Sequence, residues 1–110
     1  MTTEEKIRKI AEVLNTRKAE DVKIKKVGDL TIVADYFVLA TGTSSTQIKS
    51  LAEEVEYQLE QEGIRGRMEG KTSEWILLDY GDIICHFFLP DAREHYNLER
   101  LWADAEDVEL

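Results

Sequence analysis

The 110 residues are enough for one domain with one modest core. Their 43% hydrophobic and 34% charged content is that of an ordinary globular protein, and no apolar run approaches the roughly 20 residues that span a bilayer. A net charge of −9, from 23 acidic and 14 basic residues, argues against a phosphate backbone as the main partner, because such binding depends on Lys and Arg.

The single cysteine cannot form an intramolecular disulfide, and it fits a reducing compartment. Residues 1–5 lack the basic and apolar regions of a secretory signal. We therefore expect a cytoplasmic protein whose acidic surface suits either solubility or a basic partner.

The chain begins with a predicted helix and a predicted strand. Thr2 and Glu5 have the spacing of a capping box, and apolar residues follow at helical intervals, which predicts a helix over about residues 3–16. Residues 22–27 alternate at first between apolar and basic side chains. This alternation is typical of a strand with one wet face near a sheet edge.

A second strand and helix follow. Residues 36–41 are an apolar run of strand length, and Ser44 or Ser45 is expected to cap a helix that stops at Gly63. Gly42 to Ser45 lies at a strand-to-helix junction, where backbone N–H groups can hold an anion. It has neither the Lys of a P-loop nor the glycines of a dinucleotide fingerprint, so capping is the favoured interpretation.

Residues 67–69 are expected to form a short strand, and residues 74–88 an antiparallel hairpin. With Tyr80 and Gly81 as the two loop residues, the opposed pairs are Asp79 and Asp82, Leu77 and Ile84, Trp75 and His86. These six share one face, and the other face carries Ile76, Leu78, Ile83, Cys85 and Phe87. A G1-bulge turn with Gly81 at positive φ would slip the register by one residue.

Pro90 is expected to open a final helix that is interrupted near Asn97. Residues 103–110 contain four acids and are expected to be a frayed tail outside a domain of residues 1–102. The element order αββαβββα predicts a single mixed α/β domain of α+β type. Its mixed sheet would have four or five strands, with helices packed on it.

The search for catalytic or metal chemistry gives weak candidates. Asp79 and Asp82 could share a divalent cation with Asp35, although acids beside a tight turn more often just form the turn. Cys85 and His86 are neighbours on a strand and point to opposite faces, so they cannot form a catalytic pair. We expect no metal, no cofactor and no enzymatic activity.

Apolar residues that could be exposed gather on one side of the predicted fold. Trp75 and Leu77 share a face, and the final helix carries Tyr96, Leu98, Leu101 and Trp102. Either the final helix folds back and buries this face, or the face is an interface of aromatic anchors ringed by acids. The residues alone leave both interpretations open.

Three blocks, residues 35–45, 74–87 and 92–102, resemble the signatures of the ribosomal silencing factor family (RsfS, or Iojap). The resemblance runs from about residue 5 to 102. It implies a fold akin to nucleotidyltransferases without their catalytic carboxylates, a homodimer when free, and neither direct DNA contact nor membrane association. The alternative is a metal-dependent nucleotidyltransferase-like enzyme, using residues 42–45 for phosphates.

The family resemblance also implies a function. Family members bind protein L14 (uL14) of the large ribosomal subunit, block its joining to the small subunit, and so repress translation under nutrient limitation. The residues carried over as L14 contacts are Trp75, Leu77, Asp79, His86, Tyr96, Leu98, Glu99, Leu101 and Trp102.

Overall fold

A mixed six-stranded sheet in the order β3-β4-β5-β2-β1-β6 forms the centre of the protein. The computed structural model describes residues 1–70 and 74–109. Its elements are α1 (Thr3–Thr16), β1 (Glu20–Lys26), β2 (Tyr36–Thr41), α2 (Ser45–Gln61), β3 (Arg67–Glu69), β4 (Trp75–Asp79), β5 (Ile83–Phe88), α3 (Pro90–Tyr96), α4 (Leu98–Leu101) and β6 (Glu106–Asp107). The central pair β2 and β5 is parallel, and the other strand pairs are antiparallel.

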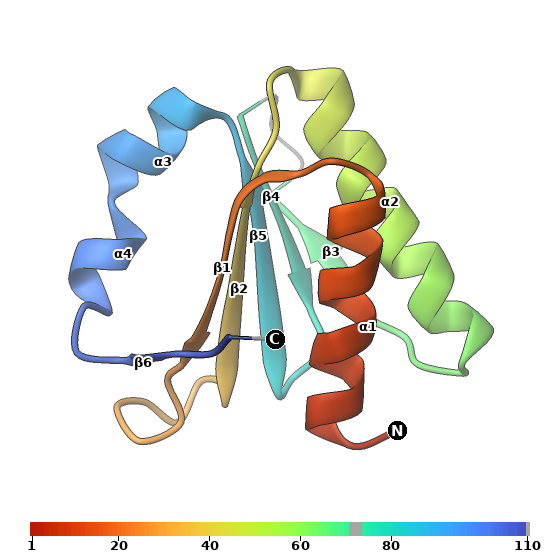
Figure 1. Cartoon of the computed structure of the whole chain (residues 1–110), viewed down its shortest axis with the longest axis horizontal. Coiled ribbons are helices and arrows are strands. Elements are labelled where there is room, and N and C mark those ends of the chain that lie inside the picture. The colour runs from red at the N-terminus through yellow and green to blue at the C-terminus, as the bar shows by residue number, and fades with distance from the viewer. Residues whose placement is uncertain (71–73, 110) are drawn as a thin grey trace.

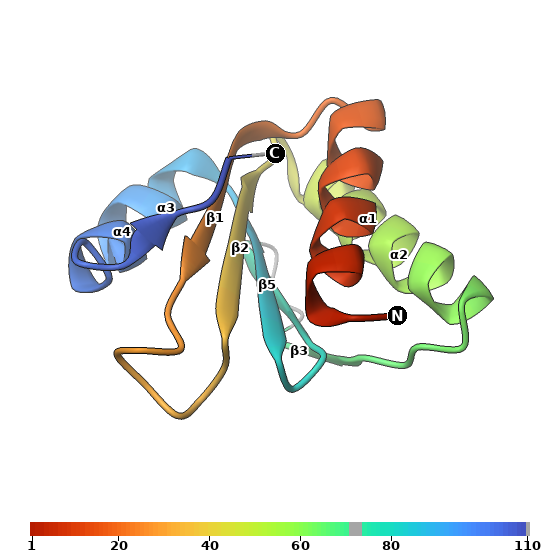
Figure 2. The same ribbon diagram turned by 60° about the horizontal axis from the view of Figure 1, so that its bottom comes forward.

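Helices lie on both sides of this sheet. Figure 1 shows α1 and α2 on one side and α3 and α4 on the other, and the rotated view agrees (Figure 2). The main core lies between the sheet and the α1–α2 layer. Among the described residues, no helix is both long and apolar enough to cross a bilayer.

The two long helices begin at the predicted caps. The Thr2 hydroxyl accepts from the Glu5 N–H at 3.2 Å, and the Glu5 carboxylate accepts from the Thr2 N–H at 2.9 Å. Ser44 caps α2, since its hydroxyl accepts from the Gln47 N–H at 3.1 Å. Past the end of α2, Gly63 has a φ of +76°, the left-handed conformation that suits a glycine stop.

The hairpin register is shifted by two residues from the predicted one. Asp79 pairs with Ile84, Leu77 with His86, and Trp75 with Phe88. Gly81 and Asp82 form the turn, and the Tyr80 N–H donates to the Ile83 carbonyl at 2.8 Å. Both predicted registers are therefore wrong.

The two faces of the hairpin are nevertheless as predicted, except that Asp82 lies in the turn and bonds to Thr3 and Lys6 on the α1 side. Moving the centre of the turn by one residue shifts the pairing by two, and strand side chains alternate with a period of two. The Asp79 carboxylate accepts from the Gly81 N–H at 2.7 Å, and Gly81 has a φ of +85°. This bond centres the turn one residue later than the apolar pattern indicates.

The C-terminal part confirms one prediction and corrects another. The final helix opens at Pro90 and is interrupted at Asn97, whose φ is 47°. The prediction that residues 103–110 are a frayed tail is wrong, because Glu106–Asp107 forms β6 on the edge of β1. This segment satisfies backbone groups that the edge of β1 would otherwise leave open, and the sheet gains a sixth strand.

Side chains support the pairing of β6 with β1. Lys25 and Asp107 form an ion pair at 2.9 Å, and the Lys25 hydrogen bond lowers the pKa of Asp107. The Val108 N–H donates to the Ile24 carbonyl at 2.9 Å, and Ala105 is buried. The acids of this segment are thus only partly a solvated tail.

Candidate protein-docking face

The sheet face opposite α1 and α2, called here the second face, carries a row of rings. Successive ring centroids lie 5.3 Å apart from Trp102 to Phe37, 5.2 Å from Phe37 to His86, 5.8 Å from His86 to Trp75, and 4.7 Å from Trp75 to Tyr96. These five residues are called the aromatic row. The row crosses β2, β5 and β4 and joins the C-terminal ends of α3 and α4 into one surface.

His86 holds Trp75 within this row. The indole Nε1–H donates to His86 Nδ1 at 3.2 Å, which requires the ring to carry its own hydrogen on Nε2 when neutral. His86 Nε2 is buried without a hydrogen-bond partner among the described residues. Burial lowers the pKa of His86 to about 4, so the ring is neutral at physiological pH.

The second face is partly core and partly surface. The terminal helices bury Leu39, Phe88 and Ala92, and Trp102 packs against a cluster that contains Phe37 and Ile84. Trp75 and Leu77 are only half-buried, while Tyr96 and Leu101 are 53% and 70% exposed. The first interpretation of this face is therefore confirmed in part, because α3 and α4 fold back over it. Apolar side chains remain exposed along it, and the interface interpretation stays a prediction.

Arg93 fixes α3 and α4 over the sheet, and sequence reasoning missed it. Its Nε donates to Glu99 at 2.8 Å, and its Nη1 donates at 2.7 Å to both the Asp21 carbonyl and the Thr41 hydroxyl. The guanidinium also lies 5.6 Å from the centroid of the Phe88 ring. Arg93 and Glu99 are six residues apart, which is not a helical pair spacing, so the sequence carries no local signal for this contact.

This arrangement gives Glu99 a role inside the chain. The hydrogen bond from Arg93 is the largest reason why the pKa of Glu99 lies below its ordinary value. Leu98 packs against the buried Leu39–Phe88–Ala92 cluster. Leu98 and Glu99, two of the nine residues carried over as contacts, therefore have structural partners within the chain.

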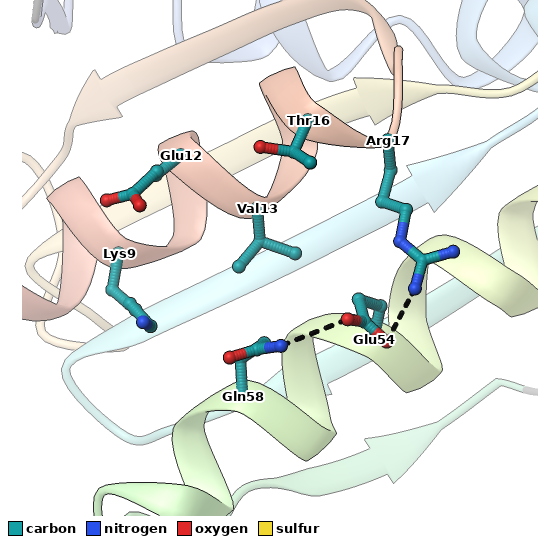
Figure 3. A pocket seen from close by; sticks show the side chains of 7 residues that line it. All are labelled: Lys9, Glu12, Val13, Thr16, Arg17, Glu54 and Gln58. Carbon is teal, nitrogen blue, oxygen red and sulfur yellow. Dashed lines mark hydrogen bonds and ion pairs between the residues drawn. The ribbon is translucent and has the colours of Figure 1, made fainter.

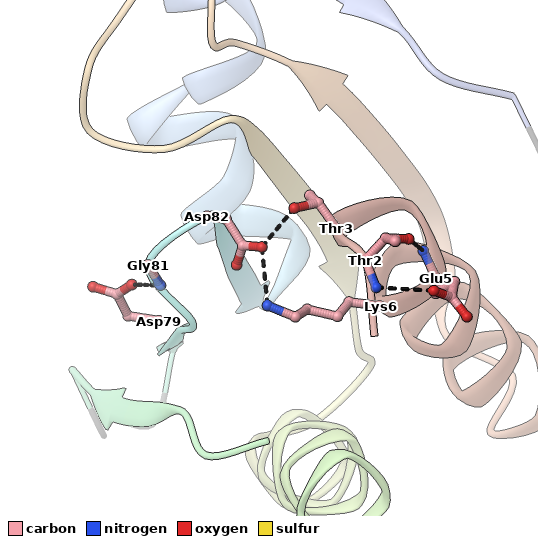
Figure 4. Close-up of polar contacts among 7 residues, drawn as sticks. All are labelled: Thr2, Thr3, Glu5, Lys6, Asp79, Gly81 and Asp82. Atoms are coloured by element: carbon pink, nitrogen blue, oxygen red, sulfur yellow. Dashed lines mark hydrogen bonds and ion pairs between the residues drawn. The ribbon is translucent and has the colours of Figure 1, made fainter. Parts of the chain in front are cut away.

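Asp79 and Asp82 do not act as a pair. Asp79 caps the turn, whereas Asp82 accepts from Thr3 at 2.7 Å and from Lys6 at 3.0 Å (Figure 4). Burial would raise the pKa of Asp82, but the two hydrogen bonds and the Lys6 charge outweigh it and lower the pKa. Across residues 1–70 and 74–109, no group of three His, Cys, Asp or Glu side chains could hold a metal ion.

The junction between β2 and α2 positions and caps the start of α2. A Cβ at Gly42 would lie 2.7 Å from Ile48 Cγ2, so the glycine allows α2 to pack closely. The Thr43 backbone N–H donates to Gln47 Oε1 at 2.6 Å, so this N–H is already used by a side chain of the first turn of α2. These contacts and the Ser44 cap confirm that the junction caps α2.

A cavity of about 140 Å³ lies between α1 and α2, on the side away from the aromatic row. Glu54, its central carboxylate, already accepts from Arg17 at 3.0 Å and Gln58 at 3.1 Å (Figure 3). These donors lower the pKa of Glu54, the Gln58 bond contributing most. The Glu54 carboxylate is therefore already engaged by two donors.

Cys85 and His86 point to opposite faces, as predicted. Cys85 lies in the main core with no exposed area, and burial raises the pKa of its thiol. His86 lies among the rings of the second face. A thiolate–imidazolium pair is therefore impossible in this fold.

Comparison with known proteins completes the description. A family model described as "Ribosomal silencing factor during starvation" matches residues 1–110. The ribosomal silencing factor RsfS of Halalkalibacterium halodurans is 35% identical over 112 residues, covering 100% of this chain and 96% of the relative. That of Bacillus subtilis is 37% identical over 102 residues, covering 91% and 86%. A crystal structure of a Chromobacterium violaceum protein has a TM-score of 0.90 and 33% identity, covering 94% of this chain and 88% of that chain.

Proposed function

Because this chain belongs to the ribosomal silencing factor family, we propose that it binds protein L14 (uL14) of the large ribosomal subunit. Bound there, it blocks the joining of the small subunit and represses translation. It acts by occupying space, as a regulatory protein of the cytoplasm without a cofactor.

The observation that carries this proposal is the aromatic row, which α3 and α4 cover only in part. Trp75 is held at one edge by His86 and by the Tyr96 ring, and it remains half-buried rather than covered. Large aromatic side chains fixed in one orientation lose little entropy on binding, and they are enriched among the residues that dominate interfaces. The row is a suitable anchor for a protein partner.

Of the nine carried-over residues, His86 is buried, Tyr96 and Leu101 are exposed, and the other six are half-buried. We assign direct contact with L14 to Trp75, Leu77, Asp79, Tyr96 and Leu101. Those that support the surface from behind or are tied to a neighbouring element are His86, Leu98, Glu99 and Trp102. We propose that the first group supplies the contact energy and the second group supplies the shape.

The charge of the chain suits a basic partner. With a net charge of −9, long-range attraction would speed the encounter with a basic ribosomal protein and disfavour RNA. The apolar anchors would then supply most of the affinity, since exposed charge pairs contribute little. We also propose that the free chain is a homodimer, which sedimentation equilibrium tests.

Co-sedimentation with isolated large ribosomal subunits tests the docking proposal. The unchanged chain should pellet with the subunits, and Trp75→Ala or Asp79→Lys should weaken this binding. Tyr57→Ala, an exposed position on α2, is the matched control and should bind like the unchanged chain. Circular dichroism would check that each variant is folded.

Two results would contradict the proposal in different ways. If Trp75→Ala and Asp79→Lys both bind normally, the face is wrongly chosen. If the unchanged chain does not bind large subunits at all, the proposed function is wrong.

A further inference from the structure

The loop between β1 and β2 exposes three aliphatic side chains within four residues. Leu30 is 49% exposed, Val33 is 62% exposed, and Ile32 has 104% of its reference area in solvent. Single exposed apolar residues are common, but a cluster at one loop tip is typical of an interaction site. Figures 1 and 2 show this loop projecting beyond the end of the sheet.

Hydrogen bonds hold the loop in this conformation. At its base, the N–H groups of Val27 and Gly28 both donate to the Asp35 carbonyl, at 2.8 and 3.1 Å. The Asp35 N–H donates to the Asp82 carbonyl at 2.9 Å, which ties the loop to the β4–β5 turn. Nearer the tip, the Leu30 N–H donates to the Val27 carbonyl at 2.9 Å. The apolar tip is thus presented by an anchored loop.

The base of the loop is continuous with the second face. Val27 and Ala34 are buried in one cluster with Phe37, and Leu77 and Trp102 pack against that cluster. Two of these residues, Phe37 and Trp102, belong to the aromatic row. A partner that covers the exposed part of the row would therefore reach the loop without crossing an unrelated surface.

We propose that the Leu30–Ile32–Val33 tip is a second anchor that inserts into an apolar recess on a basic protein surface. The inference rests on the proposed function, because it assigns the tip to the same ribosomal partner as the aromatic row. The aromatic row would contact one part of that partner and the loop tip another part. Binding at two points would fix the orientation of the domain on the subunit.

Charge at the loop selects this class of partner. From Val27 to Asp35 the chain has two aspartates and no Lys or Arg, and both aspartates are exposed; the exposed Lys26 just before this stretch lies opposite Glu106 of β6. Phosphates of RNA and anionic lipid headgroups attract basic residues, so neither fits an acidic rim. A second copy of this chain would bring the same two aspartates to the loop. A basic protein surface complements both the apolar tip and its rim.

The test compares three variants against the unchanged chain, with isolated large ribosomal subunits and with purified uL14 as probes. The double variant Ile32→Ser/Val33→Ser should raise the Kd about tenfold or more, because two aliphatic side chains lose their burial on binding. Tyr57→Ser, at another exposed large side chain, on α2, should leave the Kd unchanged. Trp75→Ala reports separately on the aromatic row.

The outcomes separate the two proposals. If the unchanged chain binds neither probe, the proposed function and this inference both fail. If it binds and Trp75→Ala weakens it while the double variant binds normally, only the second anchor is wrong. Binding to phosphatidylglycerol vesicles, or self-association, that the double variant abolishes would assign the tip to a membrane or a second copy and overturn the proposal.

Discussion

Lowering the pH should destabilise the protein through His86. In the folded chain His86 Nδ1 already accepts from Trp75, and the residue is 6% exposed. A second ring proton has no site unless that hydrogen bond breaks and a charge is buried. Burial therefore lowers the pKa of His86 to about 4 from its ordinary value of 6.5.

The sign and size of the effect follow from proton binding. Below about pH 6.5 the unfolded chain takes up a proton on His86, whereas the folded chain does so only near pH 4. Stability therefore falls as the pH drops through this window, by about 2 kcal/mol between pH 7 and 5 and about 3 kcal/mol by pH 4. Carboxylates with lowered pKa values, such as Asp82 and Glu99, begin to lose their stabilising effect as the pH falls through their ordinary values of 3.8 and 4.5, so they contribute little between pH 7 and 5.

Urea denaturation at pH 7, 6 and 5 measures this effect. The unchanged chain should lose about 2 kcal/mol of unfolding free energy across the series, and His86→Phe should lose far less. His95→Gln, a histidine exposed on α3, is the control and should keep the full pH dependence. Parallel losses in the unchanged chain and His86→Phe would refute the assignment to the buried ring.

Three further predictions concern residues that hold the fold. Arg93→Met should lower the unfolding free energy in urea by about 2–4 kcal/mol, because the Thr41 hydroxyl and the Asp21 carbonyl lose a donor; a loss similar to that of the exposed Arg100→Met would contradict this. Asp82→Asn should cost about 1 kcal/mol in the same assay by weakening the Lys6 ion pair, and no change would show that the pair is inert. Cys85 should resist a thiol reagent until denaturant is added, and rapid labelling of the folded chain would contradict its burial.

The helices and most strands were predictable because their signals are local. The caps of α1 and α2 need only residues three apart, and the apolar run of residues 36–41 coincides with β2. The hairpin faces were also predictable, because a shift of two residues preserves alternation. The register was not predictable, since the Asp79–Gly81 hydrogen bond sets the centre of the turn.

Features that depend on contacts between residues far apart in the chain could not be predicted from the sequence. β6 has two residues and forms only because the edge of β1 is open beside it. Arg93 bonds residues 72 and 52 positions away, which no local pattern encodes. Membership of the silencing factor family, indicated by three sequence blocks, is confirmed over the whole chain.

The candidate site was predictable only in part. The family resemblance indicated Trp75, His86, Tyr96 and Trp102 as site residues. The structure brings these four into one row with Phe37. Phe37 was missed because it lies in an apolar run that is indistinguishable from core. Whether these residues touch L14 stays a prediction.

The most direct test of the central claim is a subunit-joining assay. Isolated small and large ribosomal subunits are mixed with the chain, and joined ribosomes are measured on a sucrose gradient. The proposal predicts that the chain lowers the joined fraction as it binds the large subunit, and that Trp75→Ala restores joining in proportion to its lost binding. Normal joining while the chain is bound to the large subunit would contradict the proposal.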